Sequence, residues 1–362
     1  MTIRFRQEIL AIEPYSPGKP IEEVKQEYGL TDVIKLASNE NPLGPGPLAV
    51  SALQKAAGDA HLYPDGSCSR LREALGKKLA VSPSQLIVGN GSDELLKLAA
   101  EVFLGPSDSV VMADPTFSEY QFAARLMGAS VRRVPLKDFR HDLPAMAKAV
   151  DESTRMVFVC NPNNPTGTIV THGELKAFLE SVPAGVVVVL DEAYVEYVQD
   201  DGFPRALDLI GDYPNLLITR TFSKLHGLAG LRVGYGIAQP ELISLLQRVR
   251  EPFNVNALGQ AAAVAALRDF EHAAQSVQVN ESGKSFLYDL FTSLDLTYVR
   301  TNTNFVLVDV RRDSKEVFQR LLIKGVIIRS THSFGLPTYL RVTVGTDGQN
   351  RRLAVALREV LA

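Results

Sequence analysis

The chain has 362 residues, enough for roughly two domains at the usual ~100–200 residues each. It is 46% hydrophobic and 22% charged, and its 38 Lys and Arg residues against 41 Asp and Glu residues give a formal net charge of -3. This composition excludes wholesale disorder, and the near-neutral balance without a Lys/Arg-rich run argues against a nucleic-acid or membrane-surface protein.

The first 30 residues are expected to form an extended N-terminal arm, because three prolines between Glu13 and Pro20 each block a helix interior. A loop rich in Pro and Gly follows at residues 39–47, and strands then alternate with amphipathic helices. The strands are predicted at Leu86–Val88, Ser109–Ala113, Met156–Cys160, Val186–Leu190, Leu216–Arg220 and Arg232–Ile237. The helices are predicted at Leu48–Ala57, Cys68–Leu79, Asp93–Leu104, Ser118–Met127, Gly173–Glu180 and Glu241–Arg250.

This alternation predicts an α/β fold with a mostly parallel sheet covered by helices, because strands such as Val186–Leu190 are apolar on both faces. The pattern changes after about residue 255. An Ala-rich helical stretch begins at Ala257, short strands are predicted at 305–310, 326–328 and 340–344, and helices at 315–324 and 347–361. We therefore predict an arm (1–30), a large domain (31–255) and a smaller α+β domain (256–362).

Cellular context is suggested by what the sequence lacks. Two cysteines, Cys68 and Cys160, are too few for a disulfide framework and suit the reducing cytoplasm. Residues 1–10 show no long apolar stretch, so we expect no signal peptide, and the longest aliphatic run falls far short of the ~20 residues of a membrane span. The six histidines include no i, i+4 pair, so we expect no metal site.

Polar residues follow several predicted strands, at the edge where an open α/β sheet places its ligand. Residues 160–167 read Cys-Asn-Pro-Asn-Asn-Pro-Thr-Gly, which by itself could be a surface turn. Asp191 and Glu192 come directly after an aliphatic strand and could be a solvated strand end or a helix N-cap. However, Asp191 should lie at the buried sheet edge, where an unpaired charge is costly and a cationic partner is expected.

Lys224 alone would be an ordinary surface lysine, but its neighbours suggest more. Two hydroxyl residues, Thr221 and Ser223, precede it, and Arg232 follows eight residues later. This combination of neighbours disfavours an ordinary solvated surface lysine.

The order Asn164, Asp191, Tyr194, Lys224 and Arg232 resembles the fold-type I pyridoxal-phosphate aminotransferases, where Asn-Pro-Thr-Gly, Asp-x-x-Tyr, Ser-Lys and a trailing Arg occur at about these spacings. More narrowly, the chain resembles the histidinol-phosphate aminotransferase branch. The segments that carry this resemblance are 35–44, 63–66, 161–167, 191–194, 220–224 and 340–345. They extend over nearly the whole chain, so chance agreement is not credible.

The resemblance implies pyridoxal 5′-phosphate as the cofactor and gives roles to five residues. Lys224 would form the Schiff base with the aldehyde, and Asp191 would face the pyridine nitrogen and keep it protonated. Asn164 and Tyr194 would hydrogen-bond the ring 3-hydroxyl oxygen. Phe117 would stack on the ring, although without the motif it could equally be a core phenylalanine.

The cofactor phosphate would be held by donors from three places. Ser92 and Asp93 open a predicted helix, whose free amides bind anions, and Thr221, Ser223 and Arg232 add side-chain donors. By analogy with the family, Tyr63 reaches this phosphate from the neighbouring subunit, which implies a homodimer with shared active sites. The alternative for Tyr63 is a loop aromatic.

Substrate anions would be bound by two arginines. Arg341 matches the arginine that holds an amino-acid carboxylate in this superfamily, and a guanidinium suits carboxylate and phosphate alike. Arg329 would be the phosphate clamp, with Tyr15 of the arm assisting, although Arg329 could instead be a solvated strand end. The loop at 330–338 does not match the branch residue by residue.

The expected reaction is amino transfer between L-histidinol phosphate and 2-oxoglutarate, giving imidazole-acetol phosphate and glutamate in histidine biosynthesis. Two alternatives stay open. An aromatic amino-acid aminotransferase is one, because an arm like residues 14–20 occurs in such relatives. A threonine-phosphate decarboxylase-like lyase is the other, because it shares the scaffold and binds a phosphorylated amine. Lys224 and Asp191 are both present, which disfavours a non-catalytic binding protein.

Overall fold

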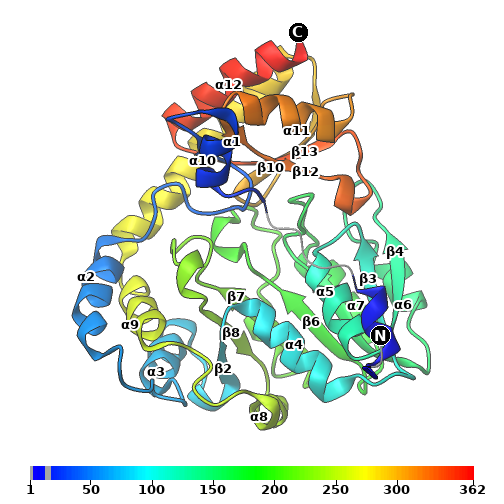
Figure 1. The fold of residues 1–362 in the computed structure, drawn as a ribbon. Helices are drawn as coiled ribbons and strands as arrows, with labels where there is room; N and C mark the ends of the chain where they lie inside the picture. Colours follow the sequence, from blue (N-terminus) through cyan, green and yellow to red (C-terminus); the bar gives the residue numbers. More distant parts are fainter. Residues whose placement is uncertain (1–2, 13–17) are drawn as a thin grey trace.

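The computed structural model describes residues 3–12 and 18–362; Tyr15 lies outside the described residues. A larger region is built around a seven-stranded sheet, and a smaller region lies above it and carries the C-terminus (Figure 1).

The larger sheet has the strand order β2-β8-β7-β6-β5-β3-β4. Its strands are β2 (Leu86–Gly89), β3 (Ser109–Asp114), β4 (Ser130–Pro135), β5 (Thr154–Cys160), β6 (Val187–Asp191), β7 (Leu216–Thr221) and β8 (Gly234–Ile237). The pairings between β7, β6, β5, β3 and β4 are parallel, whereas β8 is antiparallel to both β2 and β7. The predicted α/β fold with a mostly parallel sheet is therefore confirmed.

Helices cover both faces of this sheet. They are α2 (Pro47–Ala56), α3 (Ser69–Leu79), α4 (Ser92–Phe103), α5 (Ser118–Leu126), α6 (Leu143–Lys148), α7 (His172–Ser181), α8 (Pro240–Val249) and α9 (Ala257–Ala266). Successive strand residues enter opposite apolar clusters: Val157 belongs to one and Phe158 to the other, and both are fully buried. Burial on two faces explains why the central strands are continuous apolar runs.

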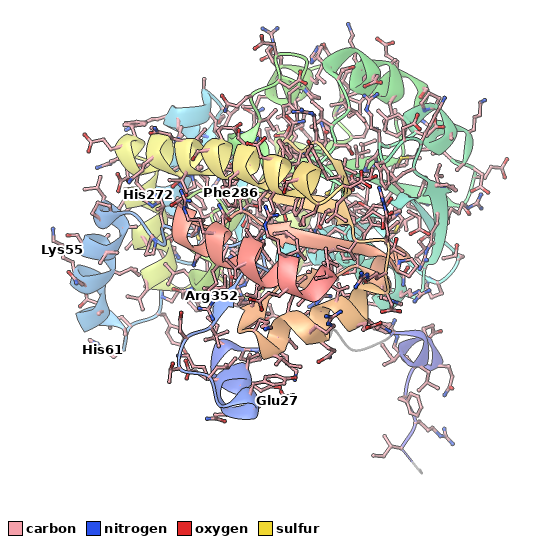
Figure 2. All side chains as sticks on the ribbon, turned by 90° about the horizontal axis from the view of Figure 1, so that it is seen from above. Glu27, Lys55, His61, His272, Phe286 and Arg352 are labelled. Carbon is pink, nitrogen blue, oxygen red and sulfur yellow. The ribbon has the colours of Figure 1, made fainter. Side chains whose placement is uncertain are left out.

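The smaller region contains a four-stranded antiparallel sheet with the order β12-β13-β10-β9. Its strands are β9 (Thr297–Val299), β10 (Phe305–Asp309), β12 (Arg329–Ser330) and β13 (Tyr339–Thr343), and its helices are α10 (Phe270–Ser293), α11 (Ser314–Ile323) and α12 (Asp347–Leu361). Seen from above, α10 and α12 lie side by side (Figure 2). The guanidinium of Arg351 lies 6.0 Å from the ring centroid of Phe286 across this contact.

The expectation of an extended arm over residues 1–30 is wrong for part of that segment. Gln7–Ala11 is a short 3₁₀ helix, and Ile21–Tyr28 is an α-helix, α1. Pro20 is the N-cap residue, so its ring blocks no helical hydrogen bond, and Gly29 ends the helix in the left-handed conformation at φ 65°. The buried side chain of Val24 anchors this helix.

Two further elements of the larger region, β4 and α6, were not predicted from the sequence. The edge strand β4 reads Ser-Val-Arg-Arg-Val-Pro, and Val134 is its one buried residue, so the apolar alternation of a strand is missing. The short helix α6 begins at the N-cap Asp142, whose side chain accepts from the Ala145 amide at 3.0 Å.

Contacts between elements indicate which segments belong to the larger region and which to the smaller one. Helix α9 contributes Ala262 and Ala263 to the core of the larger region. Near the other end of the chain, β1 (Ile34–Lys35) pairs in parallel with β11 (Val326–Ile327), and Leu36 packs in the core of the smaller region. We propose on these contacts that the smaller region begins with α10 and includes the segment around β1.

No helix within residues 3–12 and 18–362 is both long and apolar enough to cross a bilayer.

Candidate active site

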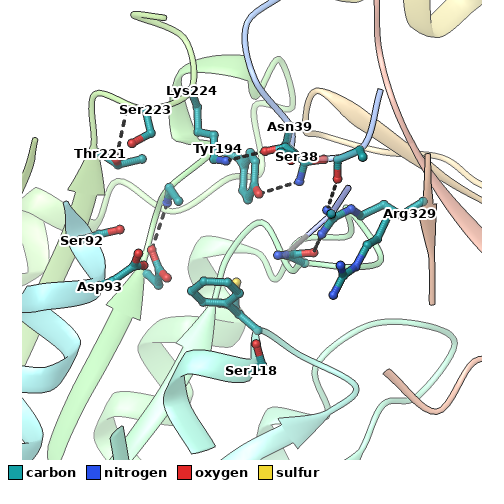
Figure 3. Close-up of a pocket in the computed structure, with 18 of the residues that line it drawn as sticks. Ser38, Asn39, Ser92, Asp93, Ser118, Tyr194, Thr221, Ser223, Lys224 and Arg329 are labelled. Carbon is teal, nitrogen blue, oxygen red and sulfur yellow. Dashed lines mark hydrogen bonds between the residues drawn. The ribbon is translucent and has the colours of Figure 1, made fainter. Parts of the chain in front are cut away.

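One pocket lies between the carboxyl ends of the larger sheet's parallel strands and the smaller region (Figure 3). All but two of the residues proposed from the sequence line it. They are Ser92, Asp93, Phe117, Asn164, Asp191, Tyr194, Thr221, Ser223, Lys224, Arg232, Arg329 and Arg341. The exceptions are Tyr15, which is outside the described residues, and Tyr63.

Asp191 is the last residue of β6 and is 2% exposed. Burial raises the pKa of its carboxyl group to about 6, even though the Tyr120 hydroxyl donates a hydrogen bond of 2.8 Å to Oδ2. The Ala193 amide donates to Oδ1 at 3.2 Å. No Lys, Arg or His in the described parts of the chain forms an ion pair with Asp191, so the expected cationic partner is not a side chain among them.

Lys224 follows β7, and its side chain enters the pocket beside Tyr194 (Figure 3). Its Nζ donates to the Ser38 carbonyl oxygen at 3.2 Å and lies 5.6 Å from the Tyr194 ring centroid. Burial, and next the positive charge of Arg341, lower the pKa of this amine to about 8. With this pKa, about a tenth of the Lys224 amines are neutral at pH 7.

Anion donors gather where α4 begins. The Arg232 guanidinium donates to Asp93 Oδ2 at 2.9 Å and to Ser223 Oγ at 3.4 Å. The Ser223 amide donates to Thr221 Oγ1 at 3.1 Å, and the first amides of α4 are free of helical partners. This arrangement of a helix N-terminus, two hydroxyls and a guanidinium fits a phosphate.

Two glycines leave room for that cradle. Gly91 has φ 80°, and a Cβ added there would collide with the Arg232 guanidinium. A Cβ on Gly234 would collide with the Ser92 amide nitrogen. Neither position accepts a side chain without displacing an anion donor.

Arg341 and Asn164 join the two regions at the pocket. Arg341, on β13 and 7% exposed, donates to Asn164 Oδ1 at 2.6 Å and to the Ala37 carbonyl oxygen at 2.7 Å. Its guanidinium also lies 5.4 Å from the Phe305 ring centroid. Arg329, half-buried on β12, is the register partner of Arg341 on the neighbouring strand and also lines the pocket (Figure 3). Two arginines therefore face one cavity, as binding two anionic groups requires.

Tyr194 is 4% exposed and held by a residue that sequence reasoning did not select. Asn39 Nδ2 donates to the Tyr194 hydroxyl oxygen at 2.9 Å. Burial raises the pKa of this phenol above its ordinary value, so it is protonated at neutral pH. Phe117, between β3 and α5, also lines the pocket and meets the Tyr120 ring edge to face at 5.6 Å between centroids.

Tyr63 does not reach the pocket of its own chain. Its side chain is 83% exposed and stacks on Phe253 with 4.7 Å between ring centroids. Leu62, also exposed, and Phe253 give this surface an apolar character.

Sequence reasoning missed several residues that line or support the pocket. Among them, Asn39 and Tyr120 contact Tyr194 and Asp191 directly, and Ser38 and Cys160 line the cavity. Asn39 lay within a noted motif, and its left-handed φ of 56° is of a kind that Asn adopts more readily than most residues. Tyr120 carried no signal, because its role depends on how α5 packs on the sheet, where its ring stacks on Phe158 and its hydroxyl reaches Asp191.

The chain resembles known proteins both in sequence and in fold. The sequence model described as aminotransferase class I and II matches residues 31–357. The histidinol-phosphate aminotransferase of Moorella thermoacetica is 59% identical over 360 residues, covering 99% of this chain and 93% of that protein. The Bacillus subtilis histidinol-phosphate aminotransferase is 49% identical over 360 residues, covering 99% of this chain and 100% of that protein.

Among solved structures, the histidinol-phosphate aminotransferase from Sinorhizobium meliloti, in complex with pyridoxal-5'-phosphate, superimposes with a TM-score of 0.92 at 30% identity. The alignment covers 99% of this chain and 97% of that one. An aspartate aminotransferase from Thermus thermophilus has the same fold, with a TM-score of 0.84 at 22% identity.

Proposed function

Because the chain belongs to the aminotransferase class I and II family, we propose that it transfers an amino group between L-histidinol phosphate and 2-oxoglutarate, giving imidazole-acetol phosphate and L-glutamate. This is a step of histidine biosynthesis. The observation that carries the proposal is the 48–59% identity, over 98–99% of the chain, to histidinol-phosphate aminotransferases.

The pocket suits pyridoxal 5′-phosphate, the cofactor of this family. When bound, it supplies an aldehyde that combines with amines and a ring that withdraws electrons from the neighbouring carbon. Asp191 offers a buried carboxylate without an ion-pair partner among the described residues, suited to a protonated ring nitrogen. Ser92, Thr221, Ser223 and Arg232 would hold the phosphate.

Lys224 is the proposed covalent anchor and proton carrier. Its depressed pKa, about 8, means that the neutral amine is accessible at physiological pH and can accept the proton from the substrate Cα. The Ser38 carbonyl and the Tyr194 ring hold Nζ within the pocket, so the amine can return that proton at a nearby carbon without diffusing away.

Asp191 is proposed to stay ionised and keep the ring nitrogen protonated. A cation next to its carboxylate would oppose the burial that raises its pKa to about 6. Tyr120, through its 2.8 Å hydrogen bond, fixes the direction of the carboxylate. Asn164 and Tyr194 are proposed to hydrogen-bond the ring 3-hydroxyl oxygen, and Phe117 to stack on the ring.

The substrate's far end is assigned to the arginines. Arg341 is proposed to bind the carboxylate of glutamate or 2-oxoglutarate, and Arg329, with Tyr15, the phosphate of histidinol phosphate. Both guanidiniums line the pocket, and a bidentate arginine suits either anion.

Tyr63 supports a homodimer with shared active sites. We propose that it reaches the cofactor phosphate of a partner subunit, since it is 83% exposed and lies outside its own chain's pocket. Tyr63→Phe should then weaken cofactor binding without changing the sedimentation coefficient of the dimer. A monomeric protein would contradict the proposed homodimer.

A cytoplasmic location is likewise proposed, because the two cysteines are free and buried.

Turnover tests the function. The protein loaded with pyridoxal phosphate should form glutamate from histidinol phosphate and 2-oxoglutarate, with no carbon dioxide released. Carbon dioxide released from threonine phosphate without an acceptor would make it a lyase. Glutamate formed from phenylalanine at a higher kcat/KM would place it in the aromatic branch.

A further inference from the structure

Tyr194 donates or accepts according to where its single hydroxyl proton points, and a hydrogen-bond chain behind it controls that direction. The chain runs from Thr343 on β13 through Asn39 to the phenol. Asn39 is 1% exposed and Thr343 3% exposed, so water does not compete for these groups.

Which atom donates at each of these hydrogen bonds follows from the number of protons that each group carries. The backbone amide of Asn39 donates to Thr343 Oγ1 at 3.0 Å, so this oxygen is already an acceptor. Thr343's own proton then goes to Asn39 Oδ1 at 3.0 Å, since no other acceptor for that hydroxyl lies in the described part of the chain. Oδ1 therefore faces Thr343, which leaves Nδ2 to face Tyr194 at 2.9 Å.

Because the Asn39 amide group is a donor toward Tyr194, the phenol oxygen accepts on that side. Its proton must point elsewhere, and the open side of the ring is the pocket, where Lys224 also lies (Figure 3). Asn39 itself is fixed by its left-handed φ of 56° and by Asn304 Nδ2, which donates to its carbonyl oxygen at 3.0 Å. The side-chain amide cannot turn over without breaking its two hydrogen bonds, to Thr343 and to Tyr194.

We propose that Asn39 and Thr343 are positioning residues that make Tyr194 a hydrogen-bond donor to the 3-hydroxyl oxygen of the cofactor. This inference rests on the proposed function, which places the cofactor there. Donation to a negatively charged oxygen stabilises it and weakens its hold on a shared proton. The acid–base midpoint of the visible band of the loaded protein is therefore set partly by Asn39.

The test is a spectrophotometric pH titration of the cofactor-loaded protein. Tyr194→Phe, which removes the donor, should raise the midpoint by about one pH unit or more. Asn39→Asp, nearly isosteric, offers only acceptors, so it should draw the phenol proton to itself and raise the midpoint similarly. Asn39→Ala removes the donor that turns the phenol proton toward the cofactor but adds no acceptor, so it should raise the midpoint by less than Asn39→Asp.

Two comparisons exclude a merely structural effect. Asn39→Asp combined with Tyr194→Phe should raise the midpoint by less than the sum of the two single effects, because part of the Asn39→Asp effect acts through the Tyr194 hydrogen bond. Thr343→Val should raise the midpoint by less than Asn39→Asp, whereas Thr343→Ser should match the unaltered protein. If Asn39→Asp does not fold, the comparison of Thr343→Val with Thr343→Ser tests the inference by itself.

The inference is overturned if Tyr194→Phe raises the midpoint but Asn39→Asp behaves like Asn39→Ala, or if the double variant is additive. It is also overturned if Thr343→Val and Thr343→Ser titrate alike, or if Tyr194→Phe leaves the midpoint unchanged. Absence of any visible band after addition of pyridoxal phosphate would instead remove the proposed function itself.

Discussion

The two walls of the pocket are built differently. On the sheet side, Asp191, Lys224 and Thr221 lie at or just after the carboxyl end of a parallel strand. The opposite wall joins distant segments: Arg341 contacts the Ala37 carbonyl across 304 residues of sequence. The first wall follows from sheet geometry, which brings strand ends to one edge. The second depends on how the smaller region packs, so substitutions there should act on substrate binding and positioning rather than on the central chemistry.

The largest effect is expected from the sheet wall. Lys224→Ala should leave a folded protein with turnover reduced by at least about 10³-fold, because the anchor and the proton carrier are one residue. The exposed Lys176, changed to Ala in the same way, is the control and should retain full activity. Retained turnover in Lys224→Ala would contradict its role.

Asp191→Asn should lower kcat by about 10²–10³-fold and change KM only slightly, because the carboxylate acts on charge that develops during proton removal. Tyr120→Phe removes only the hydrogen bond to Oδ2 and should cost about tenfold. Equal losses in kcat and in substrate affinity for Asp191→Asn would count against the proposed charge role. Steady-state kinetics and a stopped-flow half-reaction separate the two.

The sheet wall was the more predictable one. Asp191 was expected at a buried strand end because five aliphatic residues precede it, and it is 2% exposed. Nothing local indicates that Asn39 contacts Tyr194, 155 residues away, or that Tyr120 contacts Asp191, 71 residues away. Such contacts depend on how helices and strands pack against one another. Hydrophobic periodicity and turn residues predict single elements and not their packing.

Local signals also failed where burial was weak. The edge strand β4 carries two arginines in place of apolar alternation, and α1 was obscured by the prolines that precede it. By contrast, the central strands were recognisable because both their faces are buried.

On the opposite wall, Arg329→Gln should raise KM for histidinol phosphate by roughly 10–100-fold, the cost of one charge-assisted hydrogen bond, and leave KM for glutamate nearly unchanged. Arg341→Gln should impair both half-reactions, since its guanidinium also holds Asn164 at 2.6 Å. If Arg329→Gln affected both substrates alike, the division between the two arginines would be wrong.

The smallest expected effect is a change in the pH dependence of cofactor uptake, which involves Lys224 of the sheet wall and Arg341 of the opposite wall. Uptake of pyridoxal phosphate by the cofactor-free protein requires neutral Lys224, so its rate should rise about tenfold per pH unit below about pH 8 and level off above it. Arg341 lowers the pKa of this amine, so Arg341→Gln should move the midpoint to higher pH. A midpoint that stayed the same or moved to lower pH would contradict this electrostatic coupling.

The most direct test of the whole account is a half-reaction without an acceptor. The yellow, cofactor-loaded protein is mixed with L-histidinol phosphate and, separately, with L-phenylalanine, and the visible band is followed. We predict fast bleaching with histidinol phosphate and little with phenylalanine, because only the former carries a phosphate for Arg329. Bleaching with phenylalanine at a comparable or faster rate would contradict the substrate assignment.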